Sequence, residues 1–156
     1  MLKRGGTVKL QVHSNFDMLD FVQMVSDRLA HLGGLDDDAV HWIGVAVRES
    51  VINAIKHGNR MEADKPVDIK FTLDRSTLTI YVRDRGVGFD PLLIPDPLDP
   101  ENLLNPSGRG IFYMKTFMDE VDFSHHPDGG TVVRMVKRRS DPETKGDTAS
   151  DGPSND

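Results

Sequence analysis

Three short stretches that lie far apart in the chain carry side chains suited to the chemistry of a magnesium nucleotide. They are Glu49-Ser-Val-Ile-Asn53, Asp84-Arg-Gly-Val-Gly-Phe89 and Gly108-Arg-Gly-Ile111. A carboxylate can accept a proton from a hydroxyl, an amide oxygen can ligate Mg²⁺, and a glycine-rich helix start can face phosphate oxygens. Each stretch alone also fits an ordinary structural role, so their order within one small domain is what points to a nucleotide pocket.

The first stretch lies on a segment that predicts a buried helix running to about His57-Gly58. Asp36-Asp-Asp38 supplies an N-cap and acidic first-turn residues, and apolar residues then occupy most of the helix circumference. Glu49 and Asn53 interrupt this apolar segment at i and i+4, so both project from one face, and Lys56 and His57 follow one turn later. They are either polar residues at the rim of a core helix or a general base and a Mg²⁺ ligand.

The second stretch follows the apolar alternation of a predicted strand. A carboxylate at the strand end, Asp84, could accept a hydrogen bond from an exocyclic amine such as that of adenine. Gly86 and Gly88 would let the backbone pass close to a ring or a phosphate. A simple turn is the alternative. The stretch is not a Walker motif, because no Gly-Lys-Ser/Thr occurs in the chain.

The third stretch opens a short predicted helix at residues 109–117. A glycine-rich helix N-terminus presents unpaired N–H groups and the positive end of the helix dipole to an anion, and the Arg109 guanidinium suits phosphate oxygens. A capped helix with one exposed arginine is the alternative. Gly130-Thr131 fits a turn entering a strand, and His125-His126 has no further ligands nearby in sequence, so we expect no zinc site there.

The elements that must position these residues alternate in type along the chain. Strands are predicted at 6–12, 67–73, 78–83, 120–124 and 131–137, and a helix capped by Ser14 or Asn15 ends at Gly33-Gly34. The apolar face expected for that helix consists of Phe16, Leu19, Val22, Met24, Val25 and Leu29. Five prolines between residues 90 and 107 predict a long loop. The order predicts an α/β fold: a two-layer sandwich with an antiparallel or mixed sheet, mostly antiparallel, and helices on one face.

Composition sets the remaining limits. A chain of 156 residues with 37% apolar content suits one globular domain, at residues 1–139. Residues 140–156 carry −4 of the net charge of −6 and almost no apolar side chain, so we expect a disordered acidic tail. There is no cysteine, no apolar run of membrane-spanning length, no signal-peptide segment and no basic stripe for nucleic acid. We therefore expect a cytoplasmic protein without membrane or direct nucleic-acid partners.

Taken in order, the motifs resemble the nucleotide-binding elements of the GHKL (histidine kinase-like) ATPase superfamily, which has the Bergerat fold. Within it they are most similar to the bacterial anti-sigma factor serine/threonine kinases. Residues 48–58 look like the magnesium helix of that branch, and residues 95–104 followed by 107–112 look like its ATP lid and hinge. The resemblance covers about residues 7–138, nearly the whole domain.

The resemblance implies ATP and Mg²⁺ as cofactors and a role for each motif residue. Asn53 would hold Mg²⁺, and Glu49 would be the general base toward a protein serine. Asp84 would bind the adenine amine, and Thr131 would close that site. The full set of expected nucleotide-binding residues is Asn53, Lys56, His57, Asp84, Gly86, Gly88, Gly108, Arg109, Gly110, Ile111 and Thr131, with Arg109 on the terminal phosphates.

It also implies a function: a kinase that phosphorylates a serine of a STAS-type anti-anti-sigma protein, otherwise sequesters a sigma factor, and acts as a homodimer. One alternative is a module whose nucleotide gates protein binding without phosphoryl transfer, against which the presence of Glu49 argues. Another is the catalytic domain of a histidine kinase. It is disfavoured because the helix expected at 14–33 is too short for a dimerisation hairpin with an acceptor histidine.

Overall fold

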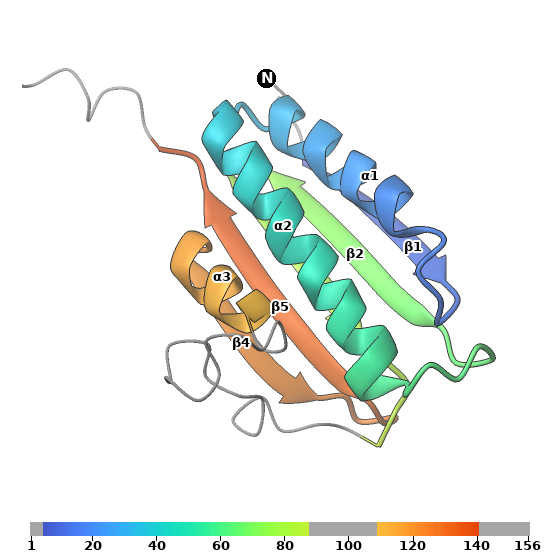
Figure 1. Ribbon diagram of the computed structural model, residues 1–156. Coiled ribbons are helices and arrows are strands. Elements are labelled where there is room, and N and C mark those ends of the chain that lie inside the picture. Colours follow the sequence, from blue (N-terminus) through green and yellow to red (C-terminus); the bar gives the residue numbers. More distant parts are fainter. Residues whose placement is uncertain (1–4, 88–108, 141–156) are drawn as a thin grey trace, which may run out of the picture.

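In the computed structural model, which describes residues 5–87 and 109–140, helices cover one face of a five-stranded sheet (Figure 1). The strands are β1 Gly6–Val12, β2 Val67–Asp74, β3 Thr77–Arg83, β4 Glu120–His125 and β5 Thr131–Arg138. Their order across the sheet is β1-β2-β3-β5-β4, and each neighbouring pair is antiparallel. The predicted two-layer α/β sandwich is confirmed, and of the two sheet types predicted, the antiparallel one is found.

The central strands follow the period-two pattern that the sequence predicted. Val67, Ile69, Phe71 and Leu73 of β2 are buried under the helices, whereas the residues between them lie on the open face of the sheet. Asp74 pairs with Thr77, so the turn between β2 and β3 is shorter than predicted, with two residues. The hydrophobic core therefore lies between the sheet and the helix layer.

The first helix begins later than predicted and is not capped as predicted. α1 spans Leu19–Leu32, and no side chain caps its N-terminus. Ser14 Oγ instead donates to the Lys65 carbonyl at 2.5 Å, and Asn15 Oδ1 accepts from the Asp17 N–H at 3.1 Å. Two residues of the expected apolar face, Phe16 and Met24, are exposed by 43% and 63%.

The second helix, α2, spans Asp37–Asn53 and is capped as predicted. Asp36 Oδ1 accepts from the Ala39 N–H at 2.8 Å. Beyond Asn53 the chain continues as a π-helical turn, η1 (Ala54–Gly58), in which the Asn59 N–H reaches back five residues to the Ala54 carbonyl at 2.8 Å. The predicted end near residue 58 is confirmed, but the wide last turn was not predicted.

The last helix, α3 (Arg109–Phe117), packs on α2 through aromatic rings. Trp42 stacks on Phe117 with ring centroids 3.8 Å apart and planes inclined by 8°, and Tyr113 stacks on Trp42 at 6.0 Å. The predicted loop at 90–107 and the predicted acidic tail fall almost wholly outside the described residues, which end at 140. None of the helices described is both long and apolar enough to cross a bilayer.

Candidate nucleotide-binding site

A buried carboxylate, Asp84, lies where the end of β3 meets the start of β5. It is 1% exposed, and its Oδ1 accepts the N–H groups of Gly86 at 2.9 Å and Thr131 at 3.2 Å. The Asp84 N–H in turn donates to the Thr131 carbonyl at 3.1 Å. Two residues predicted for one site, Asp84 and Thr131, are therefore in direct contact, and Gly86 joins them.

Three glycines close around this carboxylate. A Cβ atom on Gly58 would lie 2.6 Å from the Asp84 Cβ and would overlap its carboxyl group. A Cβ on Gly86 would lie 2.6 Å from the Gly58 carbonyl carbon, and Gly130 has a φ of 92° with its Cα against the Asp84 backbone. The end of η1 thus approaches Asp84 and Gly86 so closely that neither Gly58 nor Gly86 has room for a Cβ atom.

Burial raises the pKa of Asp84 above the usual aspartate value. The N–H groups of Gly86 and Thr131 and the positive charges of Arg83 and His125 act in the opposite direction. These N–H groups both bind Oδ1. A ligand amine that donated a hydrogen bond to this carboxylate would pair with a charged acceptor, which is the chemistry expected of an adenine-binding aspartate.

A second buried polar residue, Asn59, was missed by the sequence analysis. Its Oδ1 accepts from the Arg85 N–H at 2.7 Å, and its Nδ2 donates to Ser14 Oγ at 2.8 Å and to the Pro66 and Lys65 carbonyls at 3.0 and 3.2 Å. Asn59 therefore ties the residue after Asp84 to two other loops. In the sequence it follows Gly58 and reads as an exposed helix stop, so no signal marked it.

The predicted general base, Glu49, and the predicted Mg²⁺ ligand, Asn53, lie in the last turn of α2, directly before η1. Asn53 is 8% exposed, and Glu49 is partly buried. Burial raises the pKa of Glu49, while the nearby Arg48 and Lys56 lower it. No cluster of three or more acidic or histidine side chains able to hold a metal occurs in the described ranges. A Mg²⁺ ion at Asn53 would therefore take most of its oxygen ligands from a nucleotide and water.

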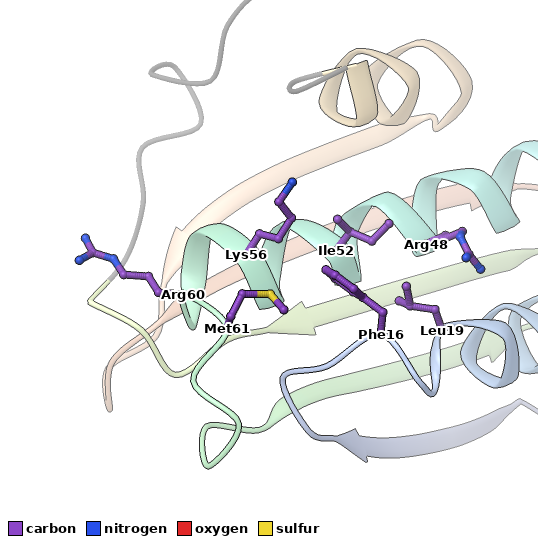
Figure 2. A pocket seen from close by; sticks show the side chains of 7 residues that line it. All are labelled: Phe16, Leu19, Arg48, Ile52, Lys56, Arg60 and Met61. Atoms are coloured by element: carbon purple, nitrogen blue, oxygen red, sulfur yellow. The ribbon is translucent and has the colours of Figure 1, made fainter. Parts of the chain in front are cut away.

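The other predicted residues are distributed unevenly around this centre. Lys56 is exposed and lies with Arg48 on a neighbouring groove (Figure 2), and His57 is partly buried, with a pKa lowered by burial and by the charge of Lys56. Ile111 belongs to the core. Arg109 and Gly110 are the first two residues of α3, whereas Gly88 and Gly108 lie outside the described residues.

Comparison with known proteins bears directly on this arrangement. The family model of the histidine kinase-like ATPase domain matches residues 17–137. The chain belongs to this family. An anti-sigma F factor of Bacillus velezensis is 33% identical over 142 residues, which cover 85% of this chain and 95% of the relative. The serine-protein kinase RsbW of Bacillus subtilis is 25% identical, with 88% of each chain covered. The resemblance to the anti-sigma factor kinase branch is thereby confirmed, and with it the prediction of a kinase-type enzyme.

A solved structure supports the fold. The RsbU and RsbW domains of a Mycobacterium tuberculosis protein superimpose with a TM-score of 0.59 at 17% identity. The match covers 85% of this chain and 32% of that one. At this identity the likeness shows the shared fold of sheet and helices.

Proposed function

We propose that this protein is an ATP-dependent serine/threonine kinase and anti-sigma factor, which phosphorylates a serine of a STAS-type anti-anti-sigma protein and otherwise sequesters a sigma factor. The observation that carries the proposal is the buried carboxylate of Asp84. It accepts the N–H groups of Thr131 and Gly86 and is closely packed against Gly58, and we call this arrangement the cradle around Asp84. The cradle lies at the end of the helix that bears Glu49 and Asn53.

Some residues of the site would bind the nucleotide and its metal ion, and another would accept a proton. Asp84 Oδ2 would accept the exocyclic amine of adenine, and the glycine contacts would leave the base flat against backbone. Asn53 would ligate Mg²⁺ through its amide oxygen. Bound Mg-ATP supplies the phosphoryl group and neutralises its developing charge.

Glu49 would act as the general base. Its carboxylate lies one helical turn from Asn53, and its raised pKa makes it a stronger proton acceptor than an exposed glutamate. In this role it would accept a hydrogen bond from the acceptor serine hydroxyl and take its proton while the serine Oγ bonds to the γ-phosphorus and ADP leaves. Arg109, at the start of α3, would bind the terminal phosphates.

The partners follow from the family rather than from the site. Relatives named anti-sigma F factor and serine-protein kinase RsbW cover most of this chain. We extend their roles to this protein, place it in the cytoplasm where ATP is available, and propose that it acts as a homodimer.

Isothermal titration with ADP and a non-hydrolysable ATP analogue, with and without Mg²⁺, tests the nucleotide part of the proposal. Binding that requires Mg²⁺ and is lost in Asp84→Asn supports it, because the amide retains the two N–H contacts at Oδ1 but cannot accept the amine at the other position. Binding that Asp84→Asn leaves unchanged would remove the carboxylate from the site.

Transfer of labelled phosphate to a purified STAS-type protein tests the kinase part. Glu49→Gln should retain nucleotide and lose transfer by about 10²–10⁴-fold, the usual contribution of a general base. Nucleotide binding without transfer in the unaltered protein would instead support the gated binding module.

A further inference from the structure

A groove lies between α2 and the start of α1, on the face of α2 next to the one that bears Glu49 and Asn53. It encloses about 760 Å³ and is lined by Phe16, Leu19, Arg48, Ile52, Lys56, Arg60 and Met61. Figure 2 shows that these side chains come from three segments: the entry to α1, the last turns of α2 with η1, and the residues just after η1. None of the residues that surround Asp84 lines it.

The groove has an apolar middle with positive ends. Phe16, Ile52 and Met61 gather at its centre, while Arg48 and Arg60 lie at opposite ends (Figure 2). Arg48 Nη1 is paired with Asp20 Oδ1 at 2.8 Å. Within the described part of the chain, no acidic side chain forms an ion pair with Lys56 or Arg60. The net charge of the groove is therefore positive.

The far wall of the groove is built by an unusual backbone. Arg60 and Met61 are consecutive non-glycine residues with φ values of 53° and 60°. This conformation is unfavourable for residues with a Cβ. It is held in place because the Met61 N–H donates to the Ile55 carbonyl at 2.8 Å and the Glu62 N–H to the Asn59 carbonyl at 3.0 Å. The turn presents a large apolar side chain, Met61, to the groove at 48% exposure.

Two large apolar side chains of the groove are exposed to solvent. Phe16 and Met61 line it and are exposed by 43% and 48%. An exposed apolar groove with a polar, charged rim is typical of a protein-binding surface.

We propose that this groove docks an acidic amphipathic helix of a partner protein. An apolar face of that helix would cover Phe16, Ile52 and Met61, and carboxylates at its edges would pair with Lys56 and Arg60. A second copy of the chain fits less well, because a two-fold contact centred here would bring two positive grooves together.

The docking surface is adjacent to the nucleotide site but separate from it. Arg48, Ile52 and Lys56 recur every fourth residue and form one stripe along α2 and η1, and Glu49 and Asn53 form the neighbouring stripe, one residue further on. The inference needs only the first stripe, so it does not rest on the proposed kinase activity.

Fluorescence anisotropy with the full chain tests the proposal. The probe is a labelled helical peptide of about 16 residues, with Leu at i, i+3 and i+7 on one face and Glu along both edges. A second peptide carries Lys in place of each Glu. The groove variant is Phe16→Ser/Arg60→Glu. The matched control is Phe21→Ser/Arg75→Glu, because Phe21 is equally exposed, at 46%, and neither residue lines the groove.

We expect the acidic peptide to bind the unaltered protein and the control variant equally. The groove variant should bind the acidic peptide at least about tenfold more weakly than the unaltered protein does, which corresponds to the loss of roughly one strong contact. The unaltered protein should bind the Lys peptide at least about tenfold more weakly than the acidic peptide. Thermal melts check that both variants are folded, and nucleotide titration checks the other site separately.

Three results would overturn the proposal. No binding of the acidic peptide, or equal losses in the groove and control variants, would show that the groove has no specific role. A groove variant that changes the mass of the protein in sedimentation while peptide binding is absent would assign the groove to contact between copies.

Discussion

Replacing Gly58 with alanine is a direct test of the cradle around Asp84. The new Cβ would lie 2.6 Å from the Asp84 Cβ, whereas ordinary contacts between such atoms begin at 3.4 Å. Since the Asp84 carboxyl group lies closer still, the two groups must separate by at least about 0.8 Å. Asp84 cannot yield freely, because its Oδ1 is bound to Gly86 and Thr131 and its backbone touches Gly130.

The effect on stability and the effect on binding should differ. Alanine favours a helix over glycine by up to about 1 kcal/mol, which offsets part of an overpacking cost of about 1–3 kcal/mol. The free energy of unfolding should thus fall by about 1–2 kcal/mol, and by no more than about 3 kcal/mol. A displaced Asp84 would lose its charged hydrogen bond to adenine, worth about 1.5–3 kcal/mol, so nucleotide affinity should fall by roughly 10–100-fold.

Isothermal titration with ADP measures the affinity, and urea unfolding measures the stability. Gly6→Ala is the matched control, since a Cβ there meets no atom within 4 Å and neither quantity should change. If Gly58→Ala binds ADP as tightly as the unaltered protein, the contact between η1 and Asp84 does not shape the pocket, and the reasoning from the cradle fails.

Three further predictions concern other parts of the site. Asn59→Ala should lower the free energy of unfolding by about 2–3 kcal/mol in urea denaturation, because the part-buried Arg85 N–H and Pro66 carbonyl lose their Asn59 partner; no loss would mean that Asn59 is not a link between the loops. Because burial raises the pKa of Glu49, kcat/KM should fall as pH drops through a value above the ordinary glutamate pKa, and the residual activity of Glu49→Gln should lack this acidic limb. Phe117→Ala should lower stability by about 2 kcal/mol and change the emission of Trp42, the chain's single tryptophan; unchanged emission would contradict the stacking.

The helices and strands were predicted well from sequence where the hydrophobic residues follow a single clear periodicity. β2 and β3 alternate strictly, and the aspartates before α2 supply both cap and first turn, so local pattern and tertiary packing agree there. The start of α1 was predicted wrongly for a tertiary reason. Serine is a good N-cap residue, but the Ser14 hydroxyl is hydrogen-bonded to the Lys65 carbonyl and to the Asn59 side chain, which lie 51 and 45 residues away in sequence.

In the site, too, features marked by local sequence motifs could be predicted, and features that depend on tertiary contacts could not. Asp84 and Thr131 could be predicted because the motifs are recognisable in sequence, and the structure joins them. The role of Gly58 could not, since it depends on how closely one turn approaches a strand from elsewhere in the chain. The exposure of Phe16 also could not be predicted, because helical spacing alone does not reveal where the helix begins.

The π-helical turn η1 has a consequence for how this pocket tolerates changes in chain length. A π turn carries one residue more than an α turn, so removing one residue between Ala54 and Gly58 would restore ordinary helical pairing. It would also rotate everything beyond by about 100°. Glu49 and Asn53 would stay in place while the glycine opposite Asp84 turned away. The two halves of the pocket are thus kept in register by a single inserted residue.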